Sequence, residues 1–323
     1  MPVLVTGGAG YIGSHIVRLL GQRGDDIVVV DDLSTGSATT VDDAPLVRLD
    51  LATPSATDGL LRVIDEYNVD AVVHLAAKKE VGVSVQRPTY YTRQNVGGMI
   101  NLLEAMETGG VRRLVYSSSA ATYGEPDVGE VDEDLSCAPI NTYGETKLIG
   151  EWMCQRSADA WGLAVSSLRY FNVAGAGWPD LGDPSSLNLV PIVFDRLVAG
   201  ERPEVFGSDY PTPDGSCIRD YVHVLDLAEA HLVVLDALGA AGHDVFNIGT
   251  GQGSSVFGVI DEIGRVTGMD ATPQVVGRRP GDPARLVANV DKAAADLGWQ
   301  SSRALSEIVT SAWEAFQVRA GTP

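Results

Sequence analysis

Tyr143 and Lys147 are a pair of side chains whose types and spacing suit proton transfer. Residues four apart share one face of a helix, so the phenol and the ammonium would lie side by side. A free tyrosine, with a pKa of about 10, is a poor base at neutral pH. A neighbouring ammonium favours the phenolate and lowers that pKa. The pair could therefore accept a proton, although the same spacing also occurs in ordinary surface pairs, and the lysine could reach ribose hydroxyls.

A run of hydroxyl residues from Ser117 to Ser119 precedes this pair. It follows Leu114 to Ser117, whose apolar start is typical of a buried strand. A hydroxyl beyond the end of that strand could hydrogen-bond the substrate oxygen that loses its proton. Serine is also common where a strand passes into a loop, so the run alone leaves both interpretations open.

The glycines near the N-terminus predict a dinucleotide site. Val3 to Val5 is typical of a buried strand, and Gly8, Gly10 and Gly13 follow it in a G-x-G-x-x-G pattern, with Gly7 completing an alternative G-x-x-G-x-x-G spacing. Such glycines allow a tight turn, close approach of the backbone to a pyrophosphate and close packing of a helix on a strand. The N-terminus of the following helix would offer free N–H groups to the phosphates.

Asp31 ends a second apolar segment, Ile27 to Val30. An acidic residue at this distance from the glycines accepts hydrogen bonds from an adenosine ribose. Asp32 follows it, and no Arg or Lys is close by in the sequence. Because two carboxylates would repel a ribose 2′-phosphate, the sequence favours NAD over NADP.

Alternating strands and helices must position these residues. Further strands are expected at Leu46–Leu49, Ala71–Leu75 and Ala164–Leu168, and helices at Leu60–Tyr67 and Tyr90–Thr108. Repeated βα units predict an α/β fold, a Rossmann-type doubly wound parallel sheet with helices on both faces. Ligands in such sheets bind beyond the carboxyl ends of the strands.

The sequence pattern changes after about Asn172, where Gly and Pro become frequent, as is typical of turn-rich segments. We therefore expect an NAD-binding Rossmann domain over residues 1–172. A smaller α/β lobe over residues 173–323 should bind the substrate, with some of its segments returning to the first domain.

Composition restricts the partners of this chain. A net charge of −20 argues against nucleic acid, whose phosphates require Lys and Arg. No apolar run is long enough to cross a membrane, and we expect no signal peptide. Cys137, Cys154 and Cys217 lack metal-site spacing, so a cytoplasmic protein with free thiols and no metal is expected. His15, His74 and His223 lie in apolar patterns and are interpreted as structural.

Segments along almost the whole chain resemble the extended short-chain dehydrogenase/reductase superfamily, and within it the family of UDP-glucose 4-epimerases. They are Val3–His15, His74–Ala77, Ser117–Gly124, Tyr143–Lys147, Arg169–Asn172, Gly207–Thr212, Arg219–Val224 and Arg278–Asp282.

The resemblance implies a catalytic group made of Ser119, Tyr143 and Lys147, in which Tyr143 is the acid and base. It implies NAD contacts at Gly7, Gly10, Tyr11, Ile12, Gly13, Asp31, Asp32, Leu33, Ser34, Thr35, Gly36, Asp50, Leu51, Leu75, Ala76, Ala77, Lys79, Asn95, Tyr143, Lys147 and Phe171. It implies substrate contacts at Ser119, Tyr143, Asn172, Asn188, Leu189, Phe206, Arg219, Tyr221, Arg279 and Asp282. Guanidinium groups pair phosphate bidentately, although a surface salt bridge is the alternative for Arg219 or Arg279 taken alone.

Ala120 and Ala121 bear on the reaction class. Related dehydratases carry acidic residues after the strand-end hydroxyl, so this chain lacks the acid and base that elimination needs. The resemblance then implies interconversion of UDP-glucose and UDP-galactose by inversion at C4, through a transient 4-keto sugar and enzyme-bound NADH. The alternatives are a 4-epimerase of UDP-glucuronate or a UDP-N-acetylhexosamine, or a non-catalytic NAD-sensing regulator.

The family also implies two further features. Subunits would pair as a homodimer through helices near residues 90–108 and 145–161. Leu286 would occupy a position that lines the sugar pocket, and its intermediate bulk favours unacetylated sugars.

Overall fold

The computed structural model describes residues 1–185, 188–279 and 281–321. The chain divides into two compact units. Unit 1 comprises Met1–Gly124, Ser136–Arg169 and Ala228–Phe246, and unit 2 comprises Glu125–Leu135, Tyr170–Leu227 and Asn247–Pro323. The assignment of cofactor binding to the first part of the chain and substrate binding to the second stays a prediction.

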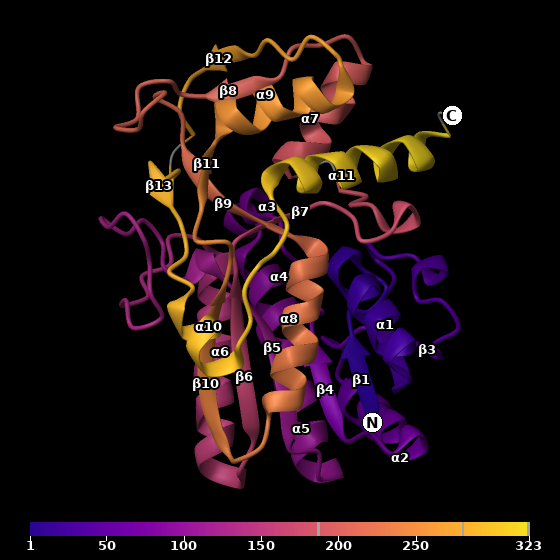
Figure 1. Ribbon diagram of the computed structural model, residues 1–323. Helices are drawn as coiled ribbons and strands as arrows, with labels where there is room; N and C mark the ends of the chain where they lie inside the picture. Colours follow the sequence, from indigo (N-terminus) through magenta and orange to yellow (C-terminus); the bar gives the residue numbers. More distant parts are fainter. Residues whose placement is uncertain (186–187, 280, 322–323) are drawn as a thin grey trace. The chain divides into compact units, whose positions relative to one another are not determined.

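The sheet of unit 1 contains seven strands among the described residues, in the order β10-β6-β5-β4-β1-β2-β3 (Figure 1). Their bounds are β1 Pro2–Thr6, β2 Asp26–Asp31, β3 Leu46–Arg48, β4 Ala71–His74, β5 Arg113–Ser119, β6 Ala164–Tyr170 and β10 Gly242–Ile248. The pairs β1–β2, β1–β4, β2–β3 and β4–β5 are parallel. The predicted Rossmann-type α/β fold is therefore confirmed.

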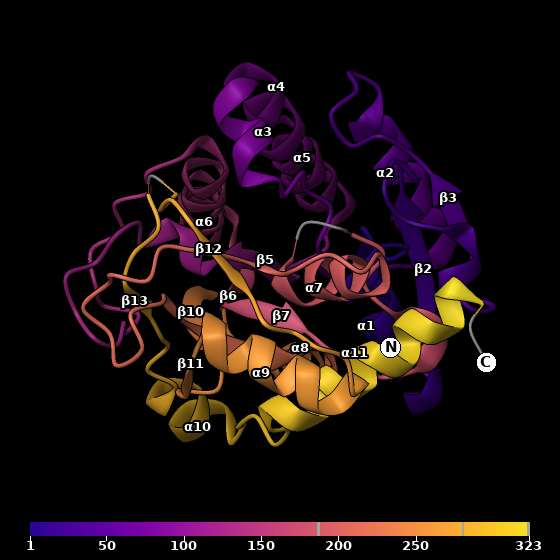
Figure 2. The same ribbon diagram turned by 90° about the horizontal axis from the view of Figure 1, so that it is seen from above.

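Helices cover both faces of this sheet, with α1 and α8 on one side and α5 and α6 on the other (Figures 1 and 2). The helices of unit 1 are α1 Tyr11–Arg23, α2 Ala56–Tyr67, α3 Val81–Gln86, α4 Pro88–Thr92, α5 Gly98–Gly109, α6 Thr142–Trp161 and α8, which begins in unit 2 and spans Val224–Ala237. Apolar strand residues such as Leu4, Val72 and Leu114 are fully buried against α5. This packing keeps the sheet rigid and fixes where its carboxyl edge lies.

The helix expected over Tyr90–Thr108 is present, and it contains a π-helical turn that the sequence did not predict. The chain forms α4, then a π-helical turn, η2, at Arg93–Gly97, and then α5. Asn95 lies in this turn, and its side chain bonds the backbone of Lys78 and the hydroxyl of Thr146. π-turns of this kind are frequent at functional sites, and the hydrophobic pattern alone does not reveal them.

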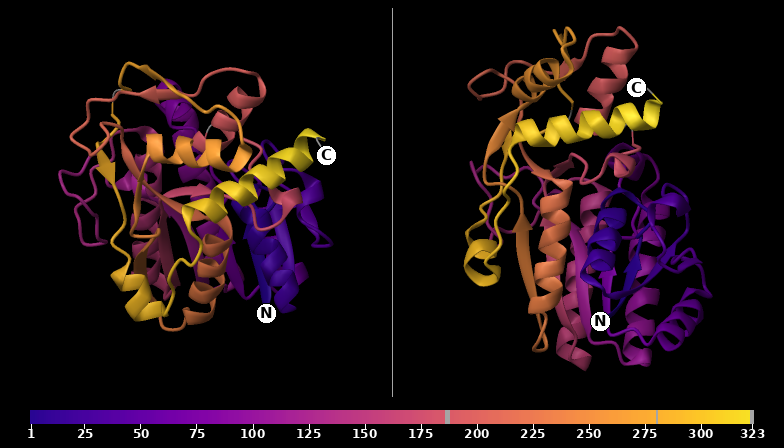
Figure 3. Two further views of the ribbon diagram at one scale, coloured as in Figure 1. Left: turned by 45° about the horizontal axis from the view of Figure 1, so that its top comes forward. Right: turned by 45° about the vertical axis from the view of Figure 1, so that its right-hand side comes forward.

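Unit 2 combines short strands with helices. Strand β9 (Ile218–His223) pairs with β7 (Asn172–Ala174), β11 (Gly253–Ser255) and β13 (Arg285–Leu286), and β8 (Glu204–Phe206) pairs with β12 (Gln274–Val276). The helices are α7 Leu189–Val198, α9 Val256–Thr267, α10 Asp291–Leu297 and α11 Leu305–Ala320. Helices α9 and α11 lie side by side, orange and yellow in Figure 3. With α7 they enclose a core that includes Phe194 and Ile260.

Candidate functional site

The residues expected to bind the cofactor gather at the carboxyl edge of the parallel sheet. They follow β1 (Gly7, Gly10, Tyr11, Ile12, Gly13), β2 (Asp31, Asp32, Leu33, Ser34, Thr35, Gly36), β3 (Asp50, Leu51) and β4 (Leu75, Ala76, Ala77, Lys79). Asn95 reaches the same edge through its bonds to Lys78. Parallel strands place all these segments on one side, as ligand sites in such folds require.

The glycine turn after β1 cannot accept side chains. Gly7 has a φ of +75°, and a Cβ there would lie 2.6 Å from the amide nitrogen of Ala76. A Cβ on Gly13 would lie 2.2 Å from the carbonyl oxygen of Gly7. Helix α1 therefore starts directly above β1, and the N–H groups of its first turn face a cradle that suits a pyrophosphate.

Asp31 ties this turn to the loop after β2. Its carboxylate accepts hydrogen bonds from the backbone N–H groups of Ala9 (3.0 Å) and Leu33 (2.8 Å). The side chain is buried at the end of β2, and this burial raises the pKa of Asp31. Each carboxylate oxygen has a further lone pair, so Asp31 can still accept ribose hydroxyls. The glycine cradle and this acid together fit a dinucleotide such as NAD.

Lys78 makes a contact that the sequence did not predict. Its ammonium lies 3.0 Å from the carboxylate of Asp32 and 2.5 Å from the hydroxyl of Ser34. No Arg or Lys is close to Asp31 and Asp32 in the sequence, but the fold places the Lys78 ammonium beside Asp32. No local signal could have revealed this contact, because β4 and β2 bring together loops that are far apart in the chain.

Ser119, Tyr143 and Lys147 meet at the end of β5. Ser119 is the last residue of β5, and its side chain hydrogen-bonds the phenol of Tyr143 in the first turn of α6. The Lys147 ammonium lies 5.9 Å from the centre of the Tyr143 ring and donates a 2.7 Å hydrogen bond to the carbonyl of Ser117. Gly144 permits this approach, since a Cβ there would lie 2.5 Å from the carbonyl oxygen of Ala121.

The electrostatics of this group differ from the sequence-based expectation. Burial raises the pKa of Tyr143, and the hydrogen bond with Ser119 acts in the opposite direction. Burial also lowers the pKa of Lys147 to about 7, although the charge of Glu151 opposes this shift. Lys147 therefore loses its charge as the pH rises through about 7. In the free protein, Lys147 alone therefore does not make Tyr143 a ready base.

A buried ion pair supports the catalytic group, and sequence reasoning missed it. Glu151 and Arg169 lie 2.7 Å apart with side-chain exposures of 4% and 6%. Ser118 donates a hydrogen bond to the same carboxylate, and Arg169 lies over the Tyr123 ring. The i, i+4 spacing of Lys147 and Glu151 on α6 was a signal that they share a face. The network fixes β5 against α6.

The residues expected to bind the substrate form three contacts within unit 2. Arg279 stacks on Phe206 with its guanidinium 3.6 Å from the ring centre. Arg219 forms a 3.3 Å ion pair with Asp282, the alternative that the sequence left open. Asn172 of β7 pairs in register with Tyr221 of β9.

The other expected ligand residues of unit 2 take no part in these three contacts. Asn188 is the N-cap of α7, whose first residue is Leu189, and the Asn188 amide donates to Asp183 at 2.6 Å. Phe171 directly precedes β7. Of the segment 278–282, Pro280 lies outside the described residues.

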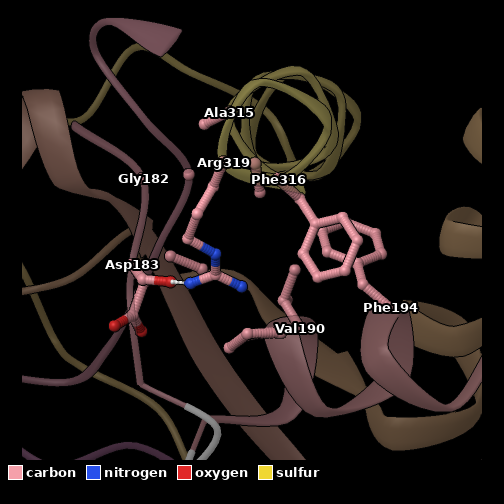
Figure 4. Close-up of a pocket in the computed structure, with 11 residues that line it drawn as sticks. Gly182, Asp183, Val190, Phe194, Ala315, Phe316 and Arg319 are labelled. Carbon is pink, nitrogen blue, oxygen red and sulfur yellow. Dashed lines mark hydrogen bonds between the residues drawn. The ribbon is translucent and has the colours of Figure 1, made fainter. Parts of the chain in front are cut away.

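A pocket in unit 2 lies between α7 and α11 (Figure 4). Apolar side chains such as Val190, Phe194 and Phe316 line it, and the Arg319 guanidinium bonds the carbonyl of Asp183 at 2.6 Å. Its lining includes Asp183 but not the expected catalytic residues. The pocket therefore lies where the segment before α7 packs against the C-terminal helix α11.

Within residues 1–185, 188–279 and 281–321, no group of three His, Cys, Asp or Glu side chains is arranged to hold a metal ion. In the same part of the chain, the helices lack the length and apolar character needed to span a bilayer. The cytoplasmic location expected from the free thiols stays a prediction.

Comparison with known proteins gives concordant matches. The model of the NAD dependent epimerase/dehydratase family matches residues 3–249. A UDP-glucose 4-epimerase of Corynebacterium glutamicum is 44% identical over 97% of this chain and 95% of its own. The crystal structure of a UDP-glucose-4-epimerase from Stenotrophomonas maltophila, with bound NAD and formylated UDP-arabinopyranose, has a TM-score of 0.95 at 37% identity and covers 99% of both chains. The UDP-Glc/GlcNAc 4-epimerase of Campylobacter jejuni has a TM-score of 0.86 at 36% identity, covering 98% of this chain and 99% of its own.

Proposed function

This chain belongs to the NAD dependent epimerase/dehydratase family, and from that premise we propose that it interconverts UDP-glucose and UDP-galactose by inversion at C4. The observation that carries the proposal is the catalytic group at the end of β5. Ser119 and Tyr143 are hydrogen-bonded, Lys147 lies on the same helix face, and Ala120 and Ala121 follow the serine. The group can move one proton, and the alanines provide no acid or base for elimination.

The proposed reaction uses the residues as follows. Tyr143 accepts the proton of the sugar 4-hydroxyl, and the Ser119 hydroxyl orients that oxygen by a hydrogen bond. Bound NAD would supply the hydride acceptor for C4 and return the hydride to the same carbon. Lys147 stabilises the phenolate while its ammonium is protonated. The 4-keto sugar can only take its hydride back, and C4 is inverted if the sugar turns over first.

Unit 2 would hold the nucleotide part of the substrate. The exposed side of Arg279, stacked on Phe206, and the guanidinium of Arg219 offer planar donors for a diphosphate. Arg219 is already paired with Asp282, so binding would replace or share that ion pair. The nucleotide should be held firmly and the hexose loosely, because the hexose must present both faces of C4.

The experiment that tests this function is incubation of the purified protein with a panel of UDP-sugars. UDP-galactose should be converted to UDP-glucose without net reduction of added NAD. A UDP-glucuronate epimerase would instead turn over the uronic form alone. A non-catalytic NAD-sensing regulator would bind dinucleotide and convert none of the sugars, an outcome against which the intact Ser119, Tyr143 and Lys147 argue.

The same panel tests the sugar preference expected from Leu286. This residue lies in β13 and pairs in register with Arg219 of β9. A side chain of this bulk should hinder an N-acetyl group, so kcat/KM for UDP-GlcNAc should be about 10-fold or more below that for UDP-glucose. Leu286→Ser should reduce the difference in kcat/KM between UDP-glucose and UDP-GlcNAc. Equal rates on the two sugars in the parent protein would refute this role for Leu286.

We also propose that two subunits pair through α5 and α6. Ile100 on α5 and Trp152 on α6 are 43% and 59% exposed, and these two helices contact each other. Of the other apolar residues on these helices, Leu102, Leu103, Met106 and Leu148 are buried in the core of unit 1, and Met153 is partly buried against it. The interface therefore rests on the exposed pair and its surroundings.

Light scattering at micromolar concentration should give twice the monomer mass, and Trp152→Glu should shift the mass to that of a monomer. Val198→Glu is the matched control, because Val198 is 58% exposed on α7 of unit 2. A monomeric parent protein, or equal disruption by both substitutions, would contradict the proposed interface.

A further inference from the structure

The side chain of Lys78 bridges two loops at the cofactor edge of unit 1. Lys78 follows β4, whereas Asp32 and Ser34 follow β2, and β1 lies between these strands in the sheet. The ammonium is 3.0 Å from the Asp32 carboxylate and 2.5 Å from the Ser34 hydroxyl. It therefore passes above the carboxyl end of β1, where the glycine turn begins.

The backbone of Lys78 is held from the other side by Asn95. The Asn95 amide accepts a 2.8 Å hydrogen bond from the Lys78 N–H and donates a 3.1 Å bond to its carbonyl. The side chain of Lys78 is 20% exposed. A half-buried ammonium on a braced backbone holds its place better than a surface lysine would.

The Lys78 ammonium pairs with only one of the two neighbouring carboxylates, Asp31 and Asp32. Asp31 receives its hydrogen bonds from the backbone of Ala9 and Leu33, whereas Asp32 pairs with Lys78. Burial alone would raise the pKa of Asp32, but hydrogen bonds from Ser34 and Lys78 hold that pKa below its usual range. Asp32 is therefore ionised and compensated, whereas among the described residues no Lys or Arg forms a hydrogen bond or ion pair with Asp31. The pair presents about one uncompensated negative charge to a ligand.

We propose that Lys78 is a cofactor-specificity residue: it neutralises Asp32, leaves Asp31 as the carboxylate that excludes a ribose 2′-phosphate, and becomes the cationic partner of that phosphate once Asp31 is removed. This inference rests on the proposed NAD site. It follows from charge balance, because a phosphate entering beside Asp31 meets repulsion that Lys78, shared with Asp32, only partly offsets. Without Asp31, the Lys78 ammonium balances the one remaining carboxylate, Asp32, so the net repulsion of the phosphate is removed and the ammonium is within reach of it.

The test is a competition between dinucleotides on the full-length protein. Each variant is equilibrated with equimolar NAD and NADP and desalted, and the retained dinucleotide is released and quantified. Asp31→Ala should raise the retained NADP:NAD ratio at least about 10-fold, as expected for loss of a close repulsive charge. Adding Lys78→Met should lower that ratio again about 10-fold, and adding Lys78→Arg should preserve it, because the guanidinium also pairs phosphate.

Lys292→Met in the Asp31→Ala background is the matched control, since it removes the same charge from α10 of unit 2. It should leave the ratio at the Asp31→Ala value. Equal ratios for Asp31→Ala with and without Lys78→Met would overturn the proposal, as would an equal effect of Lys292→Met. Thermal unfolding of each variant confirms that it is folded. Because retention is measured without a sugar substrate, failure of the inference is distinct from failure of epimerisation, which a UDP-galactose assay of the parent protein tests separately.

Discussion

Tyr143→Phe should reduce turnover of UDP-galactose by at least about 10²-fold, the usual range for loss of an acid–base group. The substitution keeps the aromatic ring, and thus its packing in the first turn of α6, but it removes the oxygen that hydrogen-bonds Ser119. Without that oxygen nothing at the end of β5 accepts the 4-hydroxyl proton directly. The KM for the sugar nucleotide should change little, because the nucleotide contacts are expected in unit 2.

Tyr67→Phe is the matched control for this prediction. Tyr67 is a partly buried tyrosine at the end of α2, packed against the core of unit 1. Tyr67→Phe removes the same kind of hydroxyl group as Tyr143→Phe, but away from the catalytic group. Its turnover should therefore stay within about twofold of that of the parent protein. Near-normal turnover by Tyr143→Phe would remove Tyr143 from the mechanism.

The protonation state of Tyr143 explains why the reaction should begin only with cofactor in place. Burial raises the pKa of this phenol, and Lys147 is itself pushed toward neutrality by burial. A buried phenolate needs nearby positive charge, and the oxidised nicotinamide ring of NAD is cationic. Tyr143 would then be a weak base in the free protein and a stronger base once NAD is bound, so a sugar that binds without NAD would not be deprotonated.

Local patterns in the sequence predicted the cofactor edge of the sheet. The apolar run before Gly7 and the run before Asp31 are short buried strands, and their order along the chain imposes parallel pairing. The serines after Leu114 and the i, i+4 spacing of Tyr143 and Lys147 likewise depend on neighbours in sequence. Each of these features needed only a few consecutive residues.

Contacts between distant segments could not be predicted in the same way. Lys78 meets Asp32 because the sheet order places β4 and β2 on either side of β1. Residues 228–246 join unit 1 and add β10 beside β6. A return of some second-half segments to the first domain was expected, but the sequence did not indicate which segments these are. Arg169 on β6 forms an ion pair with Glu151 on α6. Such contacts are set by topology, which periodicity does not encode.

The fate of the C4 hydrogen is the second large effect expected from the site. UDP-galactose deuterated at C4 should give UDP-glucose that keeps the deuterium at C4. The hydride leaves the sugar and returns to the same carbon, and hydride held on C4 of a nicotinamide does not exchange with water. Turnover in D₂O should accordingly place no deuterium at C4, C5 or C6. Mass spectrometry of the product sugar measures both outcomes.

The reason lies in the residues after Ser119. Ala120 is buried and Ala121 is half-buried in the short 3-10 helix η3 (Ala120–Thr122), and the first carboxylate further along the sequence is that of Glu125. Removing a proton from C5 requires a base above that carbon, and expelling the 6-hydroxyl requires an acid beside it. Tyr143 cannot serve both roles, because in the proposed cycle it exchanges its proton with the C4 oxygen. A dehydratase would instead draw a solvent proton onto C5, and a dehydrogenase would accumulate NADH in proportion to product. Solvent deuterium at C5, or a product lighter by one water, would refute the role assigned to the two alanines.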